Sequence, residues 1–84
     1  MLKAIVTIHL KKSILDPQGS AVHRALKALG YQGVEEVRVG KHIEVFLADT
    51  NKGEAEEKVK EMCAKLLANP VIEDYRIEIV EVGA

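Results

Sequence analysis

Four segments of the chain alternate between apolar and polar positions with the two-residue period of a half-buried β-strand. They cover residues 2–10, 34–39, 42–48 and 74–82. The alternation is clearest in the first segment, where one face is wholly apolar and consists of Leu2, Ala4, Val6, Ile8 and Leu10. Each segment predicts one strand.

Two further segments have apolar residues at helical spacing. In residues 17–29 the stripe is Val22, Leu26 and Leu29, widened by small alanines. Residues 54–68 carry a longer stripe, which consists of Ala55, Val59, Met62, Cys63, Leu66 and Leu67. Their polar face carries three Glu–Lys pairs four residues apart, a solvated arrangement: Glu54–Lys58, Glu56–Lys60 and Glu61–Lys65. Both segments predict helices that pack through one face.

Residues that favour helix ends and turns divide these segments. Asp16 before Pro17 predicts the start of the first helix, with Ser20 as an alternative cap, and Gly30 fits its end. The second helix has Thr50 or Asn51 as its cap. It ends before Asn69 and Pro70, where Asn adopts either a left-handed or an extended conformation.

The dipeptide Gly40-Lys41 has the composition of a two-residue hairpin turn between the second and third predicted strands. Lys41 would then lie at a hairpin tip, with Arg38 and His42 nearby. Such a tip is either solvated or in contact with a partner or an anion. The sequence alone leaves both interpretations open.

The resulting order, β-α-β-β-α-β, predicts one α+β domain over residues 1–84 of ferredoxin-like type. Right-handed crossovers would place both helices on one face of an antiparallel sheet. The other face exposes a β-branched and aromatic cluster that indicates an oligomer interface: Ile5, Thr7, Phe46, Val80 and Val82. We expect a homodimer or higher homo-oligomer that uses this face or a free edge strand, most readily the last strand.

Composition narrows the function. A core built from 84 residues is small, so association with another chain is reasonable. The net charge of −1 and the lack of tryptophan disfavour nucleic-acid and anionic-membrane binding. Cys63 is the only cysteine, so no intrachain disulfide can form. No leader-like or membrane-spanning stretch is visible, and we expect the protein in the cytoplasm.

No catalytic or metal site is expected in this chain. Cys63 lies on an apolar stripe, and the adjacent Glu73 and Asp74 would point to opposite faces of a strand. The histidines lie on three different predicted elements: His9, His23 and His42. The amides that begin the first helix, beside Lys11 and Lys12, could hold an anion, with a plain capped turn as the alternative.

Four stretches together closely resemble the PurS family, the small subunit of phosphoribosylformylglycinamidine synthase. They are Ile14–Gly19, the helix end Ala25–Gly30, Val37–Glu44 and Asn69–Tyr75. The most specific is the last, Asn-Pro-Val-Ile-Glu-Asp-Tyr, and the resemblance covers essentially the whole chain. Ser13 is a departure, because relatives often have Gly there, and it puts only the conformation of the loop in doubt.

The resemblance implies a role in purine biosynthesis. In that family a glutaminase subunit releases ammonia, and a large subunit that uses ATP and Mg²⁺ adds it to formylglycinamide ribonucleotide. The small subunit is implied to bridge the two as a homodimer and to assist ammonia transfer, without binding a cofactor or acting as an enzyme alone.

The resemblance also implies roles for individual positions. Subunit contacts are expected at Gly40, Lys41, Asn69, Pro70, Val71, Ile72, Glu73, Asp74 and Tyr75. An anion or subunit contact is expected at Asp16, Gln18 and Gly19.

Other proteins share this order of elements. A small-molecule-sensing regulatory domain is the main alternative, and it predicts that a ligand shifts the melting of the isolated protein. An acylphosphatase needs an arginine in its first loop, and residues 11–20 contain none. Redox carriers and metallochaperones need paired cysteines, which this chain lacks.

Overall fold

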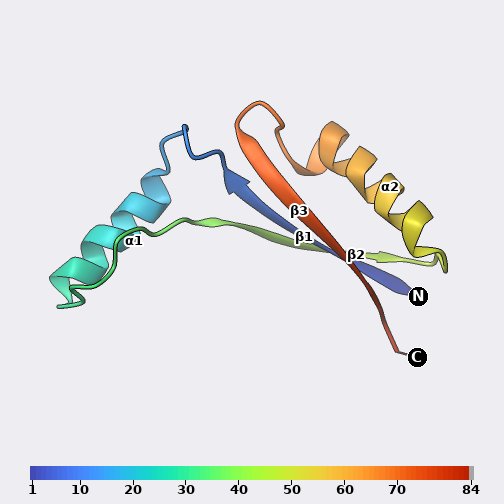
Figure 1. Ribbon diagram of the computed structural model, residues 1–84, viewed down its shortest axis with the longest axis horizontal. Coiled ribbons are helices and arrows are strands. Elements are labelled where there is room, and N and C mark those ends of the chain that lie inside the picture. Colours follow the sequence, from blue (N-terminus) through green and yellow to red (C-terminus); the bar gives the residue numbers. More distant parts are fainter. Residues whose placement is uncertain (84) are drawn as a thin grey trace.

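A computed structural model describes residues 1–83 of the chain as a three-stranded antiparallel sheet with two helices (Figure 1). The strands are β1 (Leu2–Leu10), β2 (Gly40–Leu47) and β3 (Glu73–Glu81), arranged in the order β2-β1-β3. The helices are α1 (Pro17–Ala28) and α2 (Lys52–Met62), and α2 continues into the π-helical turn η1 (Cys63–Leu67). The predicted α+β class with an antiparallel sheet is confirmed.

The central strand β1 fixes which side chains share a face. Val6 is opposite Ile43 of β2 and Ile77 of β3, so all three point to the same side of the sheet. This inner face is the one that the alternation predicts for each strand. We call the opposite side, which lies away from α2, the outer face.

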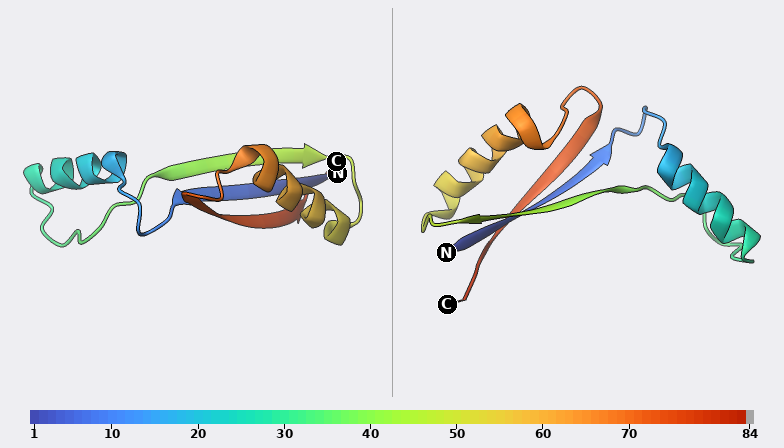
Figure 2. Two further views of the ribbon diagram at one scale, coloured as in Figure 1. Left: turned by 90° about the horizontal axis from the view of Figure 1, so that it is seen from above. Right: turned by 180° about the vertical axis from the view of Figure 1, so that it is seen from behind.

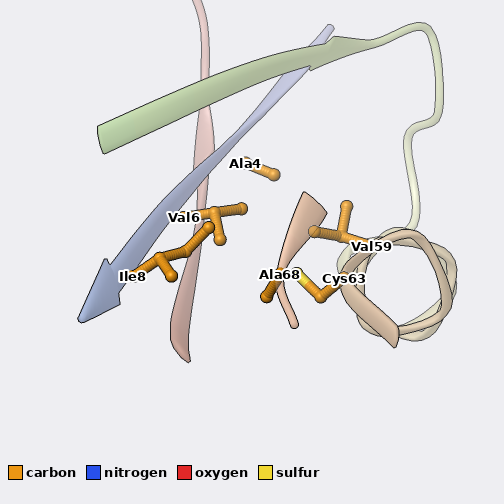
Figure 3. Close-up of a cluster of buried hydrophobic side chains, with 6 residues drawn as sticks. All are labelled: Ala4, Val6, Ile8, Val59, Cys63 and Ala68. Atoms are coloured by element: carbon orange, nitrogen blue, oxygen red, sulfur yellow. The ribbon is translucent and has the colours of Figure 1, made fainter. Parts of the chain in front are cut away.

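The buried core lies between β1 and the second helix. Val6 and Ile8 of β1 point toward Val59 and Cys63, and Ala68 lies between the two layers (Figure 3). Burial raises the pKa of the Cys63 thiol, because the thiolate would lose its hydration. Cys63 is therefore a small core residue, as its place on the apolar stripe predicts. In the described part of the chain, none of the helices combines the length and apolar character that crossing a bilayer requires.

The structure resolves the choice of helix caps. The Asp16 carboxylate accepts a hydrogen bond from the Gly19 amide at 2.9 Å, and the Asn51 side chain accepts one from the Glu54 amide at 3.1 Å. These bonds satisfy amides of the first turn that have no partner within the helix. Gly30 has a φ of +99°, the left-handed conformation that suits the residue following α1.

The end of the second helix departs from the predicted stripe. In η1 the Ala68 amide bonds the carbonyl of Cys63, five residues earlier, at 3.1 Å. This wider turn rotates the following residues, so Leu66 leaves the stripe and is 83% exposed. The residue after the turn, Ala68, is already extended, and Asn69 is not left-handed.

The charged face of the second helix follows the prediction in part. Ion pairs form between Glu56 and Lys60 and between Glu61 and Lys65. The expected Glu54–Lys58 pair does not form. Lys58 instead lies 2.7 Å from Asp49 in the preceding loop, and this hydrogen bond raises the pKa of Lys58.

The predicted hairpin turn at Gly40-Lys41 is wrong. Both residues belong to β2, with Gly40 opposite His9 and Lys41 opposite Ile8. A Cβ at Gly40 would lie 2.2 Å from the Ile8 carbonyl oxygen and 2.6 Å from a His9 ring carbon. Gly40 is therefore needed for close approach to β1, and residues 34–39 continue β2 outward instead of folding back as a strand of this sheet.

The prediction that both helices cover one face is also wrong for α1. Helix α2 lies against β1 and β3, whereas α1 projects beyond the end of the sheet (Figures 1 and 2). We call residues 17–39, which comprise α1 and the extended chain that follows it, the α1 arm. The projecting arm gives a radius of gyration of 16.3 Å. A compact chain of this length has about 12 Å.

Candidate functional site

The most specific stretch of the sequence, residues 69–75, forms a turn that is closed by its own hydrogen bonds. The Asn69 carbonyl accepts bonds from the amides of Ile72 at 3.1 Å and Glu73 at 2.8 Å. The Glu73 carboxylate accepts one in return from the Asn69 amide at 2.7 Å, and the Asn69 side chain accepts one from Val71 at 3.1 Å. We call residues 69–75 the Asn69 turn.

This turn is anchored to the sheet and presents an apolar tip. The Lys11 amide donates to the Ile72 carbonyl at 2.8 Å, which continues the pairing of β1 with β3 beyond their ends. Ile72 is half-buried, but Val71 is 78% exposed. Val71 and Ile72 are the two apolar residues of the turn that could fill the core, and only Ile72 is partly buried.

The structure brings Lys41 to the Asn69 turn. The Lys41 ammonium lies 3.6 Å from the Glu73 carboxylate, whose side chain is only 12% exposed. Lys41 of β2 is opposite Ile8 and Glu73 of β3 is opposite Leu10, so both side chains lie on the inner face at the same end of the central strand. Two groups of residues that the sequence places far apart therefore form one surface.

The loop before α1 completes this surface. A cavity of about 330 Å³ lies between the start of α1 and the ends of the strands. Its lining residues are Ile8, Leu10, Asp16, Pro17, Gln18, Val39, Gly40, Lys41 and Glu73. Five of the twelve positions for which a contact is predicted thus line one cavity, namely Asp16, Gln18, Gly40, Lys41 and Glu73.

Asp16 connects the loop to the α1 arm. One of its carboxylate oxygens caps α1 through Gly19, and the other accepts a hydrogen bond from the Val39 amide at 3.0 Å. These two bonds, the Gly19 bond foremost, hold the pKa of Asp16 below its usual value. A Cβ at Gly19 would lie 2.3 Å from the Val37 carbonyl oxygen, so only glycine fits there.

The Asp16 carboxylate bears on the predicted anion contact. The Gly19 amide already has a negatively charged partner within the chain, namely Asp16 itself. An external anion at the same amide would have to displace that carboxylate. The role of Asp16, Gln18 and Gly19 in an anion contact stays a prediction.

Four of the five residues of the predicted oligomer face lie on the outer face, where their register aligns them, and the fifth, Val82, directly follows β3. Thr7 and Ile5 lie on the central strand, with Phe46 on β2 and Val80 on β3 opposite Lys3. Phe46 is 57% exposed, and the Lys3 ammonium lies 5.9 Å from the centre of its ring. Their participation in an interface stays a prediction.

Sequence reasoning missed the exposed stripe of α1. Val22 and Leu29 fit a core-facing stripe by their spacing, yet both are exposed, and Leu29 is 74% accessible. The only side-chain hydrogen bond from α1 to the extended chain of the arm joins His23 to the Val34 carbonyl at 2.8 Å. No signal in the sequence separates a stripe that packs on its own sheet from one that packs on another chain.

Comparison with known proteins gives consistent results. The family model "PurS: Phosphoribosylformylglycinamidine (FGAM) synthase" matches residues 3–81. The phosphoribosylformylglycinamidine synthase subunit PurS of Bacillus subtilis is 51% identical over 84 residues, which cover 100% of this chain and 99% of that protein.

Solved structures agree in both sequence and fold. The crystal structure of Methanocaldococcus jannaschii PurS, described as one of the subunits of formylglycinamide ribonucleotide amidotransferase, has a TM-score of 0.89. It is 46% identical, with 99% of this chain and 100% of that one covered. A chain in the structure of PurLQS from Thermotoga maritima has a TM-score of 0.83 at 31% identity, with 95% and 99% covered.

Proposed function

Because the chain belongs to the PurS family, we propose that it bridges the glutaminase and ATP-dependent synthetase subunits of phosphoribosylformylglycinamidine synthase and assists ammonia transfer between them. Its place in that synthase and in purine biosynthesis rests on the full-length family match. The Thermotoga maritima PurLQS structure contains a similar chain within an assembly, which supports the role of a complex subunit. ATP and Mg²⁺ would be used by the synthetase subunit.

The unit that acts in this complex is, in our proposal, a homodimer. The chain exposes 6089 Å² of surface. A compact monomer of 9.3 kDa exposes roughly 5000 Å². The excess of about 1100 Å² is larger than the ~800 Å² that one partner buries in a typical stable interface. An interface that covers the α1 arm would remove most of this excess.

The position of the arm indicates how two copies would pair. Residues 34–39 are extended and continue the edge strand β2. The hydrogen-bonding edge of β2 that faces away from β1 has no partner strand in the described chain. Two copies related by a twofold axis near Gly40 can place residues 34–39 of each beside β2 of the other. The stripe of α1 would then cover the inner face of the partner's β2, which α2 leaves open. This exchange uses β2, in place of the last strand that the sequence favours.

The surface offered to the other subunits would be the Asn69 turn with Lys41. Val71 presents an apolar tip. The ion pair between Lys41 and Glu73 connects β2 to the same turn. An exposed apolar residue beside a charged pair is typical of a contact that is buried on assembly. The apolar end of the outer face, around Ile5 and Phe46, offers a second contact area.

The proposal is tested by reconstitution of the synthase from its three purified subunits. We expect this chain to be required for turnover with glutamine but not for turnover with added ammonium ions. Val71→Asp should lower glutamine-dependent turnover at least tenfold and leave ammonium-dependent turnover unchanged. The matched control is Lys60→Ala, because the Lys60 ammonium forms its ion pairs with Glu56 and Glu57 of its own helix.

Two results would contradict the proposal. Equal glutamine-dependent turnover with and without this chain would remove the bridging role. Full activity of Val71→Asp, together with full activity of Lys41→Ala and Tyr75→Ala, would show that the Asn69 turn is not the contact surface.

A further inference from the structure

A second cavity opens on the outer face, at the end of the sheet nearest the α1 arm. Its volume is about 310 Å³, which is at the lower end of the range for small-molecule sites. It is lined by Thr7, His9, Arg38, Asp74, Tyr75 and Arg76. We call this cavity the cationic pocket, and it shares none of its lining residues with the cavity at Lys41.

The strand register explains why these side chains meet. Thr7 is directly opposite Arg76, and His9 is directly opposite Asp74, so all four point to the outer face. Arg38 comes from the α1 arm, two residues before Gly40 enters the sheet. The pocket is therefore built by β1 and β3 together with one residue of the α1 arm, Arg38, at the end of the sheet.

Charge is concentrated in this pocket in a chain that is slightly negative overall. Two guanidinium groups face one carboxylate there, whereas the net charge of the whole chain is −1. Within residues 1–83, Arg76 forms no ion pair, and the only carboxylate that pairs with Arg38 is that of Glu36, at 3.9 Å. The lining residues themselves therefore carry one more positive than negative charge, and Arg76 is the guanidinium left without an ion-pair partner in the described chain.

The closest polar partner of Arg38 is a backbone carbonyl. One of its terminal nitrogens donates to the Leu10 carbonyl at 2.7 Å, which fixes the guanidinium beside the pocket. A guanidinium has five N–H donors in a rigid plane, so several remain available after this bond. An arginine held by a backbone carbonyl is prepared to bind an oxyanion with little loss of side-chain freedom.

From this arrangement we propose that the cationic pocket binds the phosphate group of a small molecule, with Arg38 and Arg76 as the charged donors and Thr7 as a hydroxyl donor. The volume has room for a sugar-sized group attached to the phosphate, whereas a free phosphate ion would leave part of it filled with water. All of its lining residues belong to one chain, so the site can be tested in the isolated protein without the other subunits.

Calorimetric titration of the isolated protein tests the site, with ribose 5-phosphate, inorganic phosphate and, at equal ionic strength, sodium chloride as three separate probes. We expect saturable binding of ribose 5-phosphate, at least tenfold weaker binding by Arg76→Gln and several-fold weaker binding by Thr7→Val. The control Arg24→Gln, on the exposed side of α1, should bind as the unchanged protein does.

Equally tight binding of inorganic phosphate would identify the free ion as the ligand and leave the site assignment intact. The assignment is overturned if no phosphate binds more tightly than chloride, or if Arg76→Gln binds as well as the unchanged protein. Thr7→Val keeps the test valid if Arg76→Gln does not fold, because valine has nearly the shape of threonine and is well accepted in a strand.

Discussion

Leu29 is the residue whose replacement most directly tests the proposed dimer. Burying a whole leucine side chain contributes about 1.5–3 kcal/mol. Since 74% of Leu29 is exposed in the single chain, complete burial by a partner contributes about 1–2 kcal/mol per copy. The replacement Leu29→Ala removes most of this contribution at both copies of a symmetric interface, about 2–4 kcal/mol in all. The dissociation constant should therefore rise about 30- to 700-fold.

Sedimentation equilibrium over a wide range of protein concentration measures this constant. Leu29 follows the last residue of α1 as its C-cap, so the replacement changes no side chain within the helix itself. Arg24→Ala is the matched control, because Arg24 lies on the same helix but on its polar side. Circular dichroism of all three proteins verifies that α1 remains helical.

The reasoning is refuted if the unchanged protein is monomeric at every accessible concentration. It is also refuted if Leu29→Ala and Arg24→Ala shift the dissociation constant equally. In the first case, the exposed stripe of α1 must be covered by one of the other subunits. In the second case, α1 lies outside the interface, and the apolar end of the outer face becomes the better candidate.

Three further predictions concern the single chain. Val59→Ala should lower the free energy of unfolding by about 2–3 kcal/mol in urea, because it leaves a cavity in the core; a loss below 1 kcal/mol would show that the core collapses around the gap. Asn51→Ala should cost about 1 kcal/mol by the same measurement, because it removes the cap of α2; Thr50→Ala is its control. Asp16→Asn should lower the melting temperature more at pH 7 than near pH 2, because the hydrogen bonds from Gly19 and Val39 lower the folded pKa of Asp16 and the stabilising charge is lost as the pH falls through that pKa; an equal difference at both pH values would contradict this.

The sequence pattern predicts the parts of the fold that depend on local periodicity and burial. The inner faces of β1, β2 and β3 have the expected residues, and the helix caps are among the candidates. The prediction failed at Gly40, where glycine satisfies two different requirements. It suits a tight turn, and it also suits a strand position with no room for a Cβ. Composition alone does not distinguish these two requirements.

The position of α1 could not be predicted for a related reason. In the strand-exchanged dimer that we propose, contacts within a chain are replaced by the same contacts between chains, so the apolar stripe on Leu26 and Leu29 has the same pattern in either state. The difference lies in whether the chain turns or continues near Gly40. That choice depends on the balance between the strain of a short turn and the entropy of association, which no single residue encodes.

The Asn69 turn shows which part of a specific motif the fold itself explains. Asn69 and Glu73 are accounted for by the hydrogen bonds that close the turn, and Ile72 by its bond to Lys11 and its partial burial. Val71 contributes only its amide to these bonds, which nearly any residue could supply, and its side chain is 78% exposed. A β-branched apolar side chain at the tip of a turn loses free energy in water and gains none from the single chain. We therefore expect the contact that explains Val71 to come from another chain, which makes it the most informative position at which to map the proposed subunit interface.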